Sequence, residues 1–232
     1  MIQGTILKQA RERVGWTQVR LAKRLRVTQA YLSLMESGRR RVPARLARRL
    51  THLLDLPPTM LPVRTVTGPG NRPTNGWFET QLGRLGYPGY AYLKHKDAMR
   101  HPAEVLLAGL TRHDLEPRLV EALPWLLLRH EGLDLGRLVD DARARNLQNR
   151  LGFMVVLARQ VAERKKGFEN RLPDLRRLEE VLEPSRLARE EPFGQGHVHE
   201  RLRGWLKKHR SSAAKHWNLL TDLRVEHLPY AS

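Results

Sequence analysis

Apolar residues recur at helical spacing in four short stretches near the N-terminus, within residues 6–14, 19–25, 31–35 and 46–54. Residues typical of helix ends separate these stretches: Thr17 and Thr28 are suited to N-caps, Gly15 and Gly38 to helix ends, and Pro43 to a first helical turn. The pattern therefore predicts four short helices. A fifth short turn is the alternative near Met60, after Pro57 and Pro58.

The rest of the chain divides at a segment rich in proline and glycine. Residues 57–76 have little periodicity, which disfavours both helix and strand. From Pro102 onward the spacing is helical again, and the stretch 147–165 is apolar on more than one face, as in a helix surrounded by others. We therefore expect an all-α protein with a four- to five-helix N-terminal domain (1–60), a linker (61–76) and a C-terminal α-helical bundle (77–232). The helices expected after Pro102 span 102–112, 117–130, 134–145, 147–165, 173–182, 197–209 and 212–223.

Three features of the C-terminal part leave alternatives open. Aromatic residues gather in 77–92, where they either pack between the linker and the bundle or form the edge of a pocket. Trp125 either belongs to the core or anchors a subunit interface. In the basic helix 197–209, we expect Leu202, Trp205 and Leu206 to be buried. Its basic face is then solvated, or it contacts an acidic protein partner or DNA.

The net charge of +18 favours a polyanionic partner, with nucleic acid first, because Lys and Arg displace counterions from a phosphate backbone. Residues 1–56 hold 13 Lys or Arg against three acidic residues, so about ten of the excess charges lie there. The chain has no cysteine, which excludes disulfides and thiolate sites and fits a reducing cytoplasm. It also has no apolar run long enough for a membrane span, so we expect a cytoplasmic protein with no membrane partner.

Four short sequences stand out in the basic N-terminal part: Thr17-Gln18, Leu21-Ala22, Val27-Thr28-Gln29 and the ending Glu36-Ser37-Gly38-Arg39. With these residues, the segment 6–56 resembles the phage-repressor and Cro family of helix-turn-helix proteins. The resemblance covers about a quarter of the chain, and residues 77–232 resemble no family that we identify. It implies that the third helix enters the major groove of double-stranded DNA.

The resemblance also implies which side chains read bases. Gln29 matches the position from which a glutamine bonds to adenine N6 and N7, and Ala30 can contact a thymine methyl group. Ser33 and Leu34 lie one turn further on the same face. Many family members are polar at the position of Leu34, so this side chain either makes an apolar contact in the groove or lies in the core.

A second set of residues is expected at the DNA backbone. Gln18 matches a position that holds a phosphate at the start of the second helix, and Tyr31 either points to a phosphate or flanks a base. Thr28 is also a candidate for a contact with the DNA backbone, although the role of an N-cap explains this residue better. We interpret Glu36 as structural, paired with a nearby Arg. The loop after the third helix supplies three further cations, Arg39, Arg40 and Arg41.

Catalytic and metal-binding patterns are absent from the sequence. No phosphate-binding glycine loop, nucleophile elbow or zinc-protease helix occurs. His197 and His199 are two residues apart and would lie on different sides of a helix, so we expect no metal site. We expect neither a catalytic residue nor a cofactor.

These observations favour a sequence-specific transcriptional regulator, a repressor that binds an operator as a homodimer, because one recognition helix reads only a few base pairs. Two alternatives remain. The chain could be an antitoxin that represses its own operon and neutralises a toxin protein through its helical domain. It could also carry a C-terminal domain that senses a small ligand or catalyses a reaction.

Overall fold

The computed structural model describes residues 2–63, 73–93, 98–194 and 198–231. The described residues form two compact units. The first unit comprises residues 2–63 together with 98–101, and the second comprises 73–93, 102–194 and 198–231. Most of the predicted linker 61–76, namely residues 64–72, lies outside the described part of the chain.

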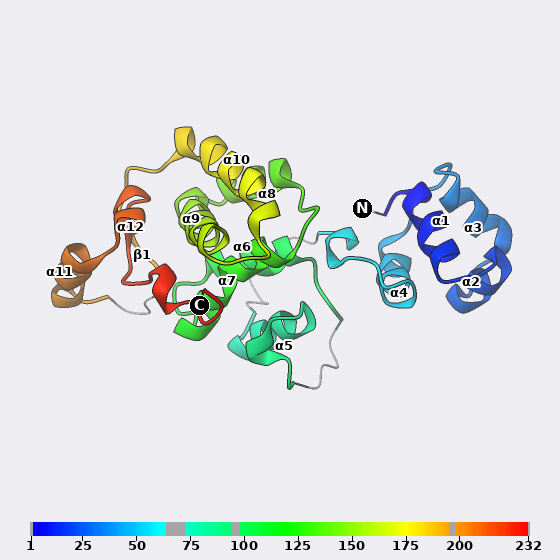
Figure 1. The fold of residues 1–232 in the computed structure, drawn as a ribbon, viewed down its shortest axis with the longest axis horizontal. Helices are drawn as coiled ribbons and strands as arrows, with labels where there is room; N and C mark the ends of the chain where they lie inside the picture. Colours follow the sequence, from blue (N-terminus) through cyan, green and yellow to red (C-terminus); the bar gives the residue numbers. More distant parts are fainter. Residues whose placement is uncertain (1, 64–72, 94–97, 195–197, 232) are drawn as a thin grey trace. The chain divides into compact units, whose positions relative to one another are not determined.

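The first unit contains the four helices that the sequence predicts (Figure 1). Positive backbone angles end the first and third helices at glycines, with φ +67° at Gly15 and +74° at Gly38. A 3-10 turn, η1 (Pro58–Met60), follows the fourth helix and confirms the alternative of a fifth short turn near Met60. The helices are α1 (Gly4–Arg13), α2 (Gln18–Leu25), α3 (Gln29–Glu36) and α4 (Ala44–Leu53).

A single leucine-rich core holds these helices together, and each fully buried leucine contributes about 2 kcal/mol of burial free energy. The segment 98–101 belongs to this unit although it follows the linker in sequence. There, His101 Nε2 donates a hydrogen bond to the backbone carbonyl of Thr59 at 3.0 Å. The most buried leucines of the core are Leu7, Leu21, Leu25, Leu32, Leu50 and Leu54.

The second unit is a helical bundle around α9 (Gln148–Arg164), on which α7, α8 and α10 pack (Figure 1). Nearly every residue of α9 from Gln148 to Ala162 is buried, which confirms a helix surrounded by others. The other helices are α5 (Asn75–Arg84), α6 (Pro102–Thr111), α7 (Pro117–Arg129), α8 (Leu135–Arg143), α10 (Leu172–Leu182), α11 (Glu200–His209) and α12 (Ser212–His216). Short 3-10 turns are η2 (Pro88–Tyr90), η3 (Glu169–Arg171), η4 (Glu183–Ser185) and η5 (Val225–His227).

Helix α5 was not predicted from the sequence. Its N-cap is Thr74, whose Oγ1 accepts a hydrogen bond from the backbone N–H of Trp77 at 3.3 Å. Gly76 and Gly83 within the helix have low helix propensity, and they mask the apolar spacing of Phe78 and Leu82, both fully buried. Packing of this apolar face therefore outweighs the local preference of the glycines.

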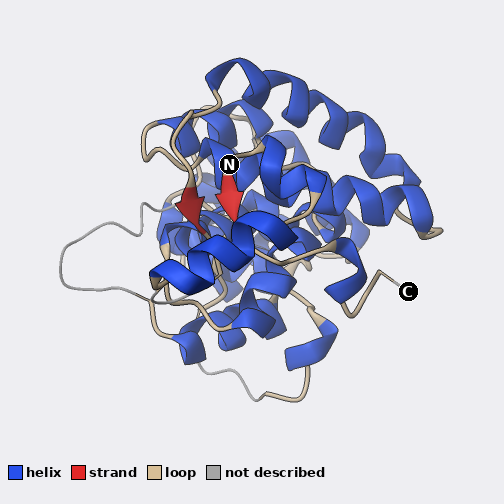
Figure 2. Cartoon of the chain, turned by 90° about the vertical axis from the view of Figure 1, so that its left-hand side faces the viewer, coloured by secondary structure: helices blue, strands red, loops and turns tan. Residues whose placement is uncertain are grey.

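The last predicted helix, 212–223, is wrong in length. Helix α12 ends at His216, and Asn218 takes a left-handed conformation with φ +52°. The chain then forms β2 (Leu219–Leu220), which pairs in parallel with β1 (Glu191–Pro192), as the two arrows in Figure 2 show. Because both leucines of β2 are fully buried, an apolar run that reads as helix serves as a short core strand.

Two tryptophans resolve further alternatives. Trp125 is only 4% exposed and meets the Tyr87 ring edge to face at a centroid distance of 5.4 Å, so it lies in the core of its unit. Trp205, which we predicted to be buried, is 46% exposed, and this prediction is wrong. In α11 the fully buried residue is Leu206. The Trp205 ring stacks on the His209 ring, one turn away, with 4.4 Å between the ring centroids.

Trp217 follows α12 and is fully buried against helix α9. A Cβ atom at Gly152 would lie 2.5 Å from three carbon atoms of the Trp217 indole. Only a residue without a side chain allows this approach, so Gly152 of α9 is required by the position of Trp217.

Candidate nucleic-acid interface

Two threonine caps set the start of the helices in the helix-turn-helix pair. Thr17 Oγ1 accepts from the Arg20 backbone N–H at 3.2 Å at the start of α2, and Thr28 Oγ1 accepts from the Tyr31 N–H at 3.1 Å at the start of α3. Both N-caps are confirmed. Between the helices, Arg26 adopts a left-handed conformation with φ +57°, which turns the chain within a few residues.

Helix α3 has one buried and one exposed face. Leu32 and Met35 are fully buried in the core, as expected for the side of the helix that holds it in place. Gln29 and Ala30 are exposed, and Leu34 is 38% exposed, which excludes the core alternative for Leu34. Ser33, on the same side, is half-buried. The four side chains that we predict to read bases thus lie on the accessible face of α3.

A chain of hydrogen bonds links the first residue of α3 to the interior. Gln29 Nε2 donates to Gln18 Oε1 at 2.8 Å, and Gln18 Nε2 donates to Glu36 Oε2 at 2.9 Å. Glu36 also accepts two bonds from Arg11, from Nε at 2.7 Å and from Nη2 at 2.9 Å. The bond to Gln18 uses one of the two Nε2 hydrogens of Gln29, and it fixes the amide in one orientation.

Within this network, Arg11 and Glu36 each favour the charged form of the other. Burial alone would raise the pKa of Glu36, but hydrogen bonds from Arg11 and Gln18 outweigh it and hold that pKa below its usual value. The hydrogen bonds that Arg11 donates to the Glu36 carboxylate raise the pKa of Arg11 in turn. Both side chains therefore stay charged, and the Arg partner that we expected for Glu36 is confirmed as Arg11.

The N-terminus of α1 lies directly against the end of α3. A Cβ atom at Gly4 would lie 2.4 Å from the carbonyl oxygen of Met35 and 2.5 Å from that of Glu36. These are backbone atoms, which cannot rotate away as a side chain can. Gly4 thus permits the approach that brings α1, with Arg11, within reach of Glu36.

The loop after α3 carries the three expected cations, Arg39, Arg40 and Arg41, and all of them are exposed. The guanidinium group of Arg40 lies over the Tyr31 ring, 4.5 Å from its centroid. The Tyr31 ring is therefore a support for Arg40.

Other cations of this unit were not singled out from the sequence. Arg20 and Arg24 of α2 lie over the Trp16 ring, with centroid distances of 5.1 and 5.5 Å. Arg49 of α4 donates to the last carbonyls of α2, at Leu25 and Arg24. No local signal could have shown this, since Arg49 lies 24 residues from Leu25 in sequence.

Metal-ligating side chains do not gather in the described residues, where no group of three or more His, Asp or Glu could hold an ion. His199 caps α11 through its Nδ1 atom, whereas His197 lies outside the described part. None of the described helices is long and apolar enough to cross a membrane.

Comparison with known proteins assigns the first unit alone. Residues 4–62 match a family model described as a helix-turn-helix domain, which covers about a quarter of the chain. No curated protein and no solved structure matches the chain. The protein therefore contains a helix-turn-helix domain, and this domain implies DNA binding. The C-terminal region has no assignment.

Proposed function

We propose that the protein is a sequence-specific transcriptional regulator that acts in the cytoplasm as a dimeric repressor, without catalytic activity or a cofactor. The observation that carries the proposal is the Gln18–Gln29 pair at the exposed start of α3. With its amide oriented by Gln18, Gln29 keeps Oε1 and one Nε2 hydrogen for the two edge atoms of an adenine. Pre-orientation reduces the entropy lost when this contact forms.

The remaining contacts divide into two kinds. Ala30, Ser33 and Leu34 extend the base-reading face, with the two apolar side chains suited to thymine methyl groups. We expect Gln18, Thr28 and Tyr31 to contact phosphates of the DNA backbone. Gln18 does so at the N-terminus of α2, which Thr17 caps. Arg39, Arg40 and Arg41 supply charge that any duplex attracts.

The experiment is a binding titration of the full chain on an operator selected from random duplexes, repeated at several salt concentrations. We expect Gln29→Ala to cost about 1–3 kcal/mol on the selected site and to flatten base preference. Arg39→Ala should weaken all duplexes alike and reduce the salt slope by about one. Gln9→Ala on the exposed side of α1 and Arg177→Ala on α10 are the matched controls. Unchanged base preference in Gln29→Ala would remove the proposed reading mode.

Dimerisation rests on geometry. A second recognition helix, about 34 Å away along the duplex, supplies the specificity that one helix lacks. We expect two-fold symmetry in the selected operator and two chains per duplex by light scattering. A single, asymmetric half-site bound by one chain would contradict the dimer.

A further inference from the structure

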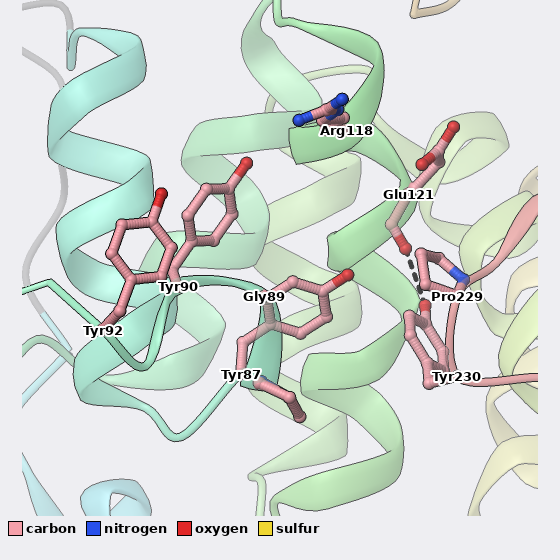
Figure 3. A pocket seen from close by; sticks show the side chains of 9 residues that line it. Tyr87, Gly89, Tyr90, Tyr92, Arg118, Glu121, Pro229 and Tyr230 are labelled. Carbon is pink, nitrogen blue, oxygen red and sulfur yellow. Dashed lines mark hydrogen bonds between the residues drawn. The ribbon is translucent and has the colours of Figure 1, made fainter.

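A pocket of about 410 Å³ lies in the second unit, among the aromatic residues that the sequence left with two interpretations. Both interpretations hold in part, because Phe78 packs in the core whereas tyrosines line the pocket. In Figure 3, Tyr87, Tyr90 and Tyr92 lie on one side, and Tyr230 lies on the other side with Glu121 of α7. The residues on which the argument rests are Tyr87, Tyr90, Tyr92, Arg118, Glu121 and Tyr230.

The tyrosine rings that line the pocket are inclined to one another at different angles. Tyr87 and Tyr230 are nearly perpendicular, with centroids 6.1 Å apart, and Tyr87 and Tyr90 are 5.8 Å apart at 40°. Gly89 lets the Tyr87 ring lie close beneath the turn η2, since a Cβ there would be 2.6 Å from a ring carbon. Tyr92 is 76% exposed and forms the rim.

The C-terminal segment fixes the opposite wall. The Tyr230 hydroxyl donates to the backbone carbonyl of Glu121 at 2.7 Å, drawn as the dashed line in Figure 3. This bond joins two positions 109 residues apart in the sequence. The walls are therefore preformed, which suits a small ligand.

The charges indicate which ligand fits. Glu121 is half-buried, and the described residues give its carboxylate no ion-pair partner. Desolvation raises the pKa of Glu121, while the charges of His227 and Arg118 act to lower it. Aromatic faces also attract positive charge. Arg118 is exposed to solvent, so water screens the effect of its positive charge on Glu121.

The geometry points to a binding site for a small organic ammonium ion, whose charged nitrogen would lie among Tyr87, Tyr90 and Tyr92, in the pocket that the half-buried carboxylate residue Glu121 also lines. The site goes beyond the proposed function in DNA recognition and does not rest on it, since every lining residue lies in the second unit. Binding of the ammonium ion makes and breaks no covalent bond.

The test is calorimetric titration of the full chain, without DNA, with defined probes. Choline and 3,3-dimethylbutan-1-ol have the same shape but differ by one positive charge, and benzyltrimethylammonium adds an aromatic body. We expect saturable binding of benzyltrimethylammonium and choline, and at least about tenfold weaker binding of the neutral alcohol. Benzoate serves as the anionic probe.

Two variants locate the site. Glu121→Gln keeps the shape of the side chain and should weaken benzyltrimethylammonium about tenfold. Tyr92→Ala removes an exposed ring that is not part of the core. It should weaken binding of benzyltrimethylammonium by about three- to fivefold. Glu180→Gln, on the exposed side of α10, is the matched control and should bind as the parent chain does.

Four results would overturn the inference. The first is no saturable binding of either ammonium probe. The second is equal affinity for choline and its neutral isostere, and the third is binding of benzoate in preference to both cations, which would make Arg118 the anchor. Unchanged affinity in both Glu121→Gln and Tyr92→Ala would place the bound cation elsewhere and overturn it as well.

Discussion

Arg11 and Glu36 form a buried, two-pronged ion pair between α1 and the last residue of α3, although 25 positions separate them in sequence. Arg11 is 7% exposed and Glu36 is 5% exposed. Arg11 also donates to the Trp16 carbonyl at 2.8 Å, so the same guanidinium holds the loop before α2. One side chain thus ties the recognition helix to the scaffold behind it.

Removing one partner should therefore be costly. Arg11→Met keeps the length of the side chain but leaves the Glu36 carboxylate buried without its cation, and we expect a loss of about 3 kcal/mol of unfolding free energy. Urea unfolding followed by a fluorescent probe on the first unit measures it. The double variant Arg11→Met with Glu36→Gln should recover part of the loss, and a single-variant loss below about 0.5 kcal/mol would contradict the pairing.

Acid should weaken the first unit through Glu36. Its folded-state pKa lies below the unfolded value of 4.5, so the stabilisation is complete above pH 4.5 and is lost as the pH falls through the folded pKa. Stability measured from pH 6 down to about pH 2 should thus fall less steeply in Glu36→Gln than in the parent chain. Parallel curves for the two proteins would show that Glu36 does not contribute.

Gly4 should tolerate no side chain. Gly4→Ala places a methyl group against two backbone carbonyl oxygens at the end of α3, and we expect a loss of about 1–3 kcal/mol in stability and weaker DNA binding. Gly76→Ala in α5 is the control, because nothing lies within 4 Å of the added atom there. It should stabilise its helix by about 0.5–1 kcal/mol, as thermal unfolding can show.

The same comparison applies to the second unit. Gly152→Ala would drive a methyl group into the Trp217 indole, which is fully buried and has no room to turn aside. We expect a loss of about 2–3 kcal/mol, whereas Gly204→Ala in α11, with open space around it, should be neutral or stabilising. Equal melting temperatures for the two variants would refute the close packing of Gly152 on Trp217.

Ammonium binding should depend on pH through Glu121. A proton and a cation compete for the same carboxylate, whose pKa lies above 4.5, so affinity should fall as the pH drops through that pKa. The charged or titratable groups that surround Glu121 are Arg118, Asp222, His227, Tyr87 and Tyr230. Repeating the titration in His227→Gln separates its charge from that of Glu121; affinity that ignores pH in both proteins would contradict the site.

Local signals were sufficient for the helices of the first unit. Thr17 and Thr28 satisfy backbone N–H groups of their own helices, and Gly15 and Gly38 end helices by their own backbone angles. Such effects act within a few residues, so the sequence displays them directly. The exposed position of Gln29 and Ala30 on α3 agrees with what the family resemblance implied.

Long-range packing decided what the sequence did not show. The glycines of α5 obscured its helical spacing in the sequence. Pairing with β1 holds the residues after Asn218 in a strand, where a helix was predicted. Trp205 was placed on the buried face by spacing alone, yet Leu206 occupies that face. The pocket joins segments as distant as Glu121 and Tyr230, and no local pattern carries that contact.

The helix-turn-helix unit is discontinuous along the chain, because the segment 98–101 returns to it after the linker. A fragment cut at residue 62, where the family match ends, would lose the bond between His101 and Thr59. Such a fragment would retain every residue proposed to touch DNA and yet leave the turn η1 without its cover. We therefore expect the smallest stable fragment with the helix-turn-helix domain to include residues 98–101, beyond the matched residues 4–62.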